Sequence, residues 1–212
     1  MVKALIIGAG AIGRGFLPWC LPDESSITFF DLNSDLIKSL DNLGYYHSFL
    51  SSQESLNKKL VKGYFYSDLK EIDSKLDTFD ICFIAVGPRN IEKLPNLIRK
   101  ITCPIFSLEN DSHTVFRIRD KFSIPNVFFG VPDVITSCTA SPDSLAIDNN
   151  ALHTEDGVLY LESDGYENLK TNLPRTLSAS KEVIEKEWDA KLYLHNTPHC
   201  IAAYLGAEFG CK

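Results

Sequence analysis

Three closely spaced glycines directly after a short apolar run constrain the fold of this chain more than any other feature. Residues 2–7 predict a buried strand, and Gly8, Gly10 and Gly13 follow it in the pattern Gly-x-Gly-x-x-Gly. In such a turn the first glycine permits a tight bend, the second lets the backbone approach a pyrophosphate, and the third lets a helix pack closely on the strand. Residues 12–21 predict that helix, whose N-terminus would direct unpaired N–H groups at the phosphates.

A second strand and its last residue indicate which dinucleotide would bind. Residues 27–31 are rich in β-branched and aromatic side chains, so we expect a strand that ends at Asp31. A carboxylate at this position accepts hydrogen bonds from the ribose 2′-hydroxyl of NAD and would repel the 2′-phosphate of NADP. We therefore predict NAD(H) as the cofactor, with Ile12 and Asn33 beside it, although Asn33 also suits the N-cap of the next helix. In the alternative interpretation, the glycines only shape a turn in a sheet that binds nothing.

Further strands and helices alternate along the chain. Nearly continuous apolar runs are typical of parallel strands covered on both faces, and apolar residues spaced three and four apart predict helices, the first of which ends near Gly44. The alternation predicts a Rossmann-type α/β fold, a doubly wound and mostly parallel sheet that is followed by the start of a helical domain. The expected strands are residues 79–87, 104–108, 126–131 and 158–162, and the expected helices are residues 33–43 and 90–100.

Val86 and Gly87 end one of these strands at the carboxyl edge of the expected sheet, where ligands sit in open α/β folds. Gly87 would permit close approach of the cofactor, and a plain strand-ending turn explains it equally well. Arg14, on the first helix, would either reach a phosphate or remain a solvated helix arginine.

Composition limits the classes of partner that this chain is expected to bind. The formal net charge is -7 and no cluster of Lys and Arg predicts a basic face, which argues against a nucleic acid partner. No window approaches the roughly eighteen consecutive apolar residues that a membrane-spanning helix needs. The six cysteines are scattered without a Cys-x-x-Cys pair, which fits neither a zinc site nor a disulfide scaffold. We expect no metal, reduced cysteines and a cytoplasmic location.

The character of the chain changes at Ser180. Residues 181–207 contain no strand-like run and many helix formers. We therefore predict an NAD-binding domain over residues 1–179 and the N-terminal portion of a helical catalytic domain over residues 180–212. Helix faces left uncovered in such a partial domain would favour association with a second copy of the chain.

Three chemically useful side chains lie close together in that helical segment. On a helix, His199 lies about 80° and Asn196 about 140° around the axis from Lys191, so all three fit one half of the surface. Pro198 would clash with a carbonyl one turn earlier, so we expect a kink or break there. His195 is an alternative histidine. Spacing alone favours a plain interpretation, with an exposed lysine, a capping asparagine and a packing histidine.

These three residues also resemble a family signature. Lys191, Asn196 and His199 match the Lys-x-x-x-x-Asn-x-x-His pattern of the polyol-specific long-chain dehydrogenases, and residues 196–206 look very like the mannitol-1-phosphate 5-dehydrogenase and mannitol dehydrogenase family. The resemblance is spread over nearly the whole chain. Its other segments are residues 3–16, residues 85–88 and the pair Glu109 and Asn110.

The resemblance implies a metal-free, NAD-dependent oxidoreductase that interconverts a sugar alcohol, its phosphate or a sugar acid with the corresponding ketose. Lys191 would be the general base that takes the hydroxyl proton, which requires burial to lower its pKa. Asn196 and His199 would hold the reacting oxygen and stabilise its developing negative charge. Further along the chain, the residues expected to contact the cofactor are Val86, Gly87, Glu109 and Asn110.

Two departures from the family pattern limit what the resemblance implies. Val134 stands where many relatives carry an arginine, although the neighbouring Asp133 is retained. Family members also continue well past the position of Lys212 into a helical domain that covers the substrate, so we expect a C-terminally truncated chain. The alternatives are an NAD(H)-binding module without efficient catalysis, or a different Rossmann enzyme such as a relative of the 6-phosphogluconate dehydrogenases.

Overall fold

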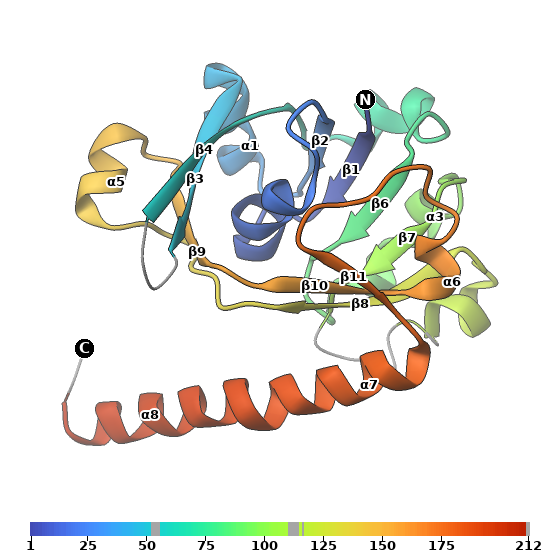
Figure 1. Cartoon of the computed structure of the whole chain (residues 1–212). Coiled ribbons are helices and arrows are strands. Elements are labelled where there is room, and N and C mark those ends of the chain that lie inside the picture. The colour runs from blue at the N-terminus through green and yellow to red at the C-terminus, as the bar shows by residue number, and fades with distance from the viewer. Residues whose placement is uncertain (52–55, 110–114, 116, 211–212) are drawn as a thin grey trace.

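The structure, a computed structural model, describes residues 1–51, 56–109, 115 and 117–210. Its centre is a sheet of eight strands, most of them parallel (Figure 1). In spatial order the strands are β11 (Thr176–Ala179), β10 (Val158–Glu162), β8 (Val127–Asp133), β7 (Ile105–Ser107), β6 (Ile81–Ile84), β1 (Lys3–Ile7), β2 (Ser26–Phe30) and β5 (Tyr64–Tyr66).

The strand order confirms the doubly wound fold. From β1 the chain builds outward through β2 to β5, and it then returns to build β6, β7 and β8 on the other side, all parallel to β1. The direction of winding therefore reverses between β1 and β6, and open α/β sheets bind ligands beside such a reversal. β10 is antiparallel to β8 and β11 is parallel to β10, so the sheet is mixed at this edge.

Both faces of the central strands are buried, as their continuous apolar sequence predicts. Along β1, Ala4 and Ile6 belong to the hydrophobic cluster on one face, whereas Leu5 and Ile7 belong to the cluster on the other. Each of these side chains is at most 1% exposed, and full burial of a leucine or isoleucine contributes about 1.5–3 kcal/mol. The central strands therefore form a rigid platform.

A second, smaller sheet was not expected from the sequence. It has three strands in the order β4 (Leu56–Lys62), β3 (Tyr45–Ser51) and β9 (Leu152–Glu155), with β3 antiparallel to β4 and parallel to β9. Three lysines on β4 interrupt the alternation of apolar and polar residues by which a strand is usually predicted. β9 is separated from β3 by about a hundred residues of sequence, so local pattern does not reveal their pairing.

The helices of the first 170 residues are short, and two differ in type from the predicted ones. The helix expected at residues 12–21 is a π-helical turn followed by a 3-10 turn, and the helix expected at 90–100 is divided into a 3-10 turn and a single α-turn. Helix α1 (Ser34–Leu43) agrees with the helix predicted at residues 33–43, because Asn33 caps its start and Gly44, with a φ of 70°, ends it. The helical elements are η1 (Ala11–Phe16), η2 (Leu17–Cys20), α1 (Ser34–Leu43), α2 (Leu69–Ile72), η3 (Asp73–Lys75), η4 (Ile91–Lys93), α3 (Pro95–Ile98), η5 (Arg117–Lys121), α5 (Pro142–Ile147) and α6 (Ser163–Tyr166).

The C-terminal segment is one continuous helical run across the lower side of the molecule in Figure 1. It comprises α7 (Lys181–Ala190), η6 (Lys191–Asn196) and α8 (Thr197–Glu208). Of the kink or break expected at Pro198, the break does not occur. The chain widens into a π-type turn just before the proline, where the Thr197 N–H donates to the Leu192 carbonyl, and the helix then continues.

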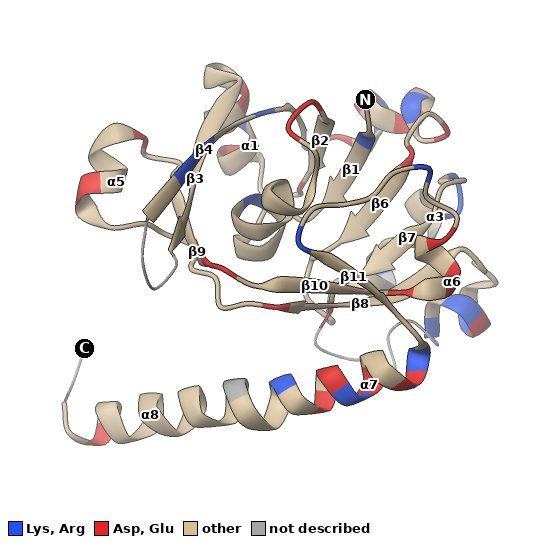
Figure 2. Cartoon of the chain, in the orientation of Figure 1, with Lys and Arg blue, Asp and Glu red and all other residues tan. Residues whose placement is uncertain are grey.

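The two ends of this run differ in burial and charge. Ile184 of α7 is fully buried against the sheet, whereas α8 buries no side chain and exposes Ile201 and Tyr204. Charged side chains are frequent on α7 and rare on α8 (Figure 2). Among the residues that the structure describes, no helix has both the length and the apolar character needed to cross a membrane.

Candidate functional site

The glycine-rich turn between β1 and η1 is held by backbone contacts that exclude larger side chains. Gly8 has a φ of 104°, a conformation that other residues rarely adopt, and a Cβ there would overlap the Ala85 carbonyl oxygen. A Cβ on Gly13 would overlap the Gly8 carbonyl oxygen. Both glycines are therefore required by the fold itself, whether or not a ligand binds.

Gly10 differs from the other two glycines. A Cβ built on Gly10 meets no protein atom within 4 Å, so packing alone does not require glycine here. The residue faces a cleft of about 530 Å³ at the carboxyl ends of β1, β2 and β6, lined on one side by Leu94 and Leu97. Clefts of this size hold small molecules, and the position suits close approach of a phosphate group to the backbone.

Asp31 lies at the far end of the same cleft and organises two loops. Its Oδ2 accepts a hydrogen bond from the Ala9 N–H at 2.7 Å, and its Oδ1 accepts one from the Asn33 N–H at 2.8 Å. Each carboxylate oxygen can accept a further hydrogen bond, so Asp31 can still receive a donor from the cleft. The Asn33 side chain caps α1 by accepting from the Leu36 N–H at 3.2 Å, and Asn33 also lines the cleft.

The loop after β6 is held by a buried carboxylate. Oε1 of Glu109, a residue only 5% exposed, accepts hydrogen bonds from the Val86 N–H at 2.7 Å and the Gly87 N–H at 2.9 Å. Gly87 has a φ of 85°, so this turn needs a glycine. Glu109 therefore positions the loop through its backbone. Asn110 lies outside the described residues.

Two polar residues that the sequence analysis missed lie next to this loop. Asn90 donates from Nδ2 to the Val86 carbonyl at 2.9 Å, and Lys93 donates from Nζ to Asn90 Oδ1 at 3.0 Å. Both line the cleft. Their place just after the carboxyl end of a predicted parallel strand was the signal that could have identified them.

Arg14 is not a solvated helix arginine, so that expectation is wrong. Its side chain is buried, donates from Nε to the Ala9 carbonyl at 2.6 Å and from Nη1 to the Asn150 carbonyl at 2.9 Å, and stacks over the ring of Tyr46. Burial lowers the pKa of Arg14. The arginine thus ties the glycine-rich turn to the second sheet. Ile12 is half-buried and packs against the core.

Lys191 is buried at the same edge of the main sheet as the glycine-rich turn. Its side chain is directed from η6 to the carboxyl end of β8, where Nζ donates to the Pro132 carbonyl, and only 8% of the residue is exposed. Burial lowers the pKa of Lys191, and the neighbouring Asp133 carboxylate partly offsets this. A buried amine with a lowered pKa can take a proton near neutral pH.

The other two residues of the triplet are less enclosed. Asn196 is half-buried and His199 is exposed, so the structure packs only Lys191 against the sheet. The side chain of His195 lies outside the described part. Val134, in the place of a family arginine, is 7% exposed and belongs to the hydrophobic core.

The cysteines and the acidic groups offer no metal centre within the described residues, where no cluster of three potential ligands occurs. Cys20, Cys82 and Cys103 are buried and free, as expected for core residues. Cys138 and Cys200 are free and exposed.

Comparison with known proteins gives the relatives of the chain. No family model matches it. The mannitol-1-phosphate 5-dehydrogenase of Buchnera aphidicola is 24% identical over 240 residues, an alignment that covers 97% of this chain and 59% of that protein. The enzyme of the same name from Exiguobacterium sibiricum is 26% identical over 228 residues and covers 99% of this chain. The chain is similar to mannitol-1-phosphate 5-dehydrogenases over nearly its whole length. It spans 59% of the Buchnera protein and 58% of the Exiguobacterium protein.

Solved structures agree on the architecture. An octopine dehydrogenase bound to NADH and L-arginine superposes with a TM-score of 0.61 and 12% identity, covering 84% of this chain and 49% of that one. A 2-dehydropantoate 2-reductase from Geobacter metallireducens has a TM-score of 0.56 and 16% identity, covering 83% of this chain and 58% of that one. The Rossmann-type fold predicted from the sequence is therefore confirmed.

Proposed function

We propose that this chain carries the NAD(H)-binding part of a dehydrogenase that interconverts a sugar alcohol, its phosphate or a sugar acid with the corresponding ketose. The observation that carries the proposal is Gly10, which is glycine although no protein atom requires it, and which faces the cleft at the reversal of the sheet. A pyrophosphate beside the backbone explains this choice of residue.

The cleft fits NAD(H) in its polar as well as its apolar groups. The phosphates would lie at the glycine-rich turn before η1, with Asp31 receiving ribose hydroxyls at the end of β2. A 2′-phosphate would meet the Asp31 carboxylate, which favours NAD over NADP. The apolar wall formed by Leu94 and Leu97 suits a flat aromatic base. When bound, the nicotinamide ring supplies the hydride acceptor.

Lys191 is the residue we assign to proton transfer. In alcohol oxidation its neutral amine would take the hydroxyl proton, and in ketone reduction its ammonium would return that proton to the oxygen. The burial that lowers its pKa raises the fraction of neutral amine at neutral pH. Asn196 and His199 would donate to the same oxygen from the following turn and stabilise negative charge on it.

The experiment has two readouts. Titration of the chain with NADH, followed by calorimetry, tests cofactor binding, and oxidation of mannitol 1-phosphate with NAD, followed by NADH absorbance, tests turnover. We expect NADH to bind more tightly than NADPH. Equal affinity for the two would contradict the role of Asp31, and turnover retained in Lys191→Ala would contradict the role of the lysine.

A second candidate function is an NAD(H)-binding module without efficient catalysis. The observation that favours it is the exposure of His199 and of most of α8, which leaves the region beyond Lys191 open to water. Catalysis by hydride transfer benefits from the exclusion of water. The same pair of assays distinguishes the candidates, because a module binds NADH and does not turn over.

We keep the division into an NAD-binding domain over residues 1–179 and the beginning of a helical domain over residues 180–212 as part of the proposal. α7 starts directly after β11 and packs on the sheet through Ile184, which would connect the two parts rigidly. Self-association through the exposed face of α8 stays a prediction, and sedimentation measurements test it.

A further inference from the structure

A second cavity lies at the opposite edge of the main sheet. Its volume is about 480 Å³, and its walls are the chain before β1, the residues before β6 and β7, and the segment between α6 and β11. These are the amino ends of the parallel strands, whereas Gly10 and Lys191 lie at their carboxyl ends. The cavity is therefore separate from the proposed cofactor site.

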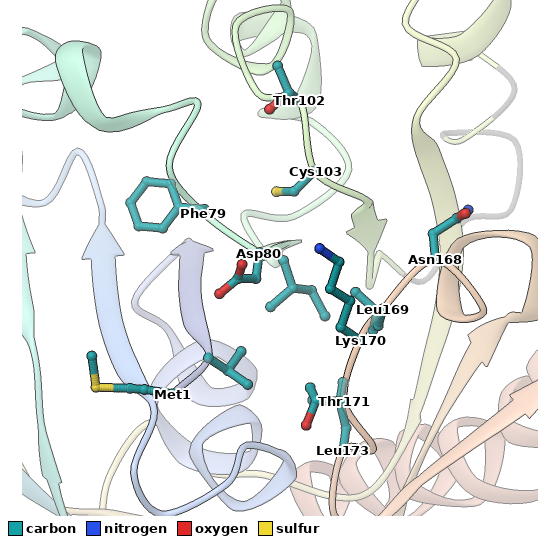
Figure 3. Close-up of a pocket in the computed structure, with 12 residues that line it drawn as sticks. Met1, Phe79, Asp80, Thr102, Cys103, Asn168, Leu169, Lys170, Thr171 and Leu173 are labelled. Atoms are coloured by element: carbon teal, nitrogen blue, oxygen red, sulfur yellow. The ribbon is translucent and has the colours of Figure 1, made fainter.

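Two exposed side chains of opposite charge line this cavity and do not pair with each other. In Figure 3, Lys170 extends from one wall toward Asp80 and Cys103 on the others. Lys170 has no hydrogen-bond or ion-pair partner in the part of the chain that the structure describes. Oδ2 of Asp80 accepts from the Lys3 N–H at 2.8 Å, which holds the carboxylate in place. The cavity thus keeps an ammonium and an oriented carboxylate apart.

The lining of the cavity is mixed, with two buried apolar residues beside the polar ones. Ile81 is 1% exposed and Leu173 is 4% exposed, and both line the cavity. Burial raises the pKa of the Cys103 thiol to about 12, so this side chain stays neutral and lines the wall as an apolar group rather than as a nucleophile. The hydroxyls of Thr102 and Thr171 complete the lining.

We propose that this cavity binds a small zwitterion of the α-amino acid type, with its carboxylate on Lys170, its ammonium on Asp80 and an aliphatic side chain on the apolar floor. Both charged residues are exposed to water, so a ligand with one charge would pair with one of them and leave the other hydrated. A ligand with both charges would pair with both, which favours molecules that carry both charges. Each contact would be a charge-assisted hydrogen bond, the kind that contributes most in a partly enclosed site.

Three ligands that share one branched aliphatic group test the proposal: L-leucine, isocaproate, which lacks the ammonium, and isoamylamine, which lacks the carboxylate. Binding to the whole chain is measured by calorimetry and by shifts of the Leu169 and Leu173 methyl resonances. We expect L-leucine to bind about tenfold or more tightly than either single-charge ligand, the factor associated with one charge-assisted hydrogen bond.

The variants identify which group contacts which charge. Lys170→Gln should remove the advantage of L-leucine over isoamylamine, and Asp80→Asn, which retains an oxygen for the Lys3 N–H, should remove its advantage over isocaproate. Lys186→Gln, an exposed lysine on α7, is the matched control and should change neither ratio. Equal binding of all three ligands, no binding at millimolar concentration, or ratios unchanged in both variants would each overturn the proposal.

Discussion

Substitution of Gly10 tests whether this glycine is needed for cofactor binding or for folding. In Gly10→Ala the new methyl group meets no protein atom within 4 Å, and the backbone φ of -81° is ordinary for alanine. The free energy of unfolding should therefore stay the same or rise by about 0.4–1 kcal/mol, because alanine lowers the entropy of the unfolded chain. The methyl group would, however, occupy the space where the cofactor phosphates approach the backbone.

The expected loss of cofactor affinity follows from that geometry. If the methyl group prevents one charge-assisted hydrogen bond between a backbone N–H and the pyrophosphate, binding weakens by about 1.5–3 kcal/mol, which is roughly 10- to 150-fold in Kd. Calorimetric titration with NADH measures this loss, and urea unfolding of the same sample measures stability. Wild-type affinity for NADH in Gly10→Ala would refute the assignment of the cleft.

Two other glycines of the same turn and helix serve as controls. A Cβ on Gly15 meets its nearest neighbour, Thr154, at 3.9 Å on the side of the second sheet, so Gly15→Ala should leave NADH affinity unchanged. Gly13→Ala should instead lower stability by about 1–3 kcal/mol, because its Cβ overlaps the Gly8 carbonyl oxygen and the turn must move.

Three further predictions concern residues away from this turn. Glu109→Gln should weaken NADH binding by about 1 kcal/mol, measured by titration, because an amide oxygen holds the two loop N–H groups less strongly than a carboxylate; unchanged affinity would contradict its positioning role. In a form that turns over, the rate of alcohol oxidation should rise with pH and level off above the lowered pKa of Lys191, since only the neutral amine accepts the proton; a rate that falls over this range would contradict the assignment. Ile184→Ala should cost about 2–5 kcal/mol in urea unfolding, whereas Ile201→Ala, at a residue that is 54% exposed, should cost less than about 1 kcal/mol; similar losses would mean that α8 is packed in solution.

Predictions from the sequence succeeded where the signal was local. The strand, glycine turn, helix and strand that lead to Asp31 are adjacent in the chain, and Gly8 and Gly13 are required by contacts within that unit or with the strand beside it. The continuous apolar runs of β6 and β7 identified buried parallel strands for the same reason. The cap at Asn33 also depends on a neighbour only three residues away.

Contacts between distant segments were not predictable in the same way. Arg14 is buried because Tyr46 of β3 and Asn150, in the turn before β9, contact it, and these two residues are far apart in sequence. From its sequence neighbours alone, an arginine on a helix is predicted to lie at the surface, since isolated charges are rarely buried. Glu109 likewise acts through the backbone of a loop 22 residues earlier.

The sequence by itself determined the α/β architecture, the dinucleotide turn and the identity of the three residues after Ser180 that resemble a dehydrogenase signature. Only the tertiary structure decided the environment of those residues. Lys191 is buried because α7 packs on the sheet and delivers its amine to the Pro132 carbonyl, and burial in turn lowers its pKa. Helical spacing fixes which side chains share a face, whereas the burial that changes their chemistry depends on what packs against that face.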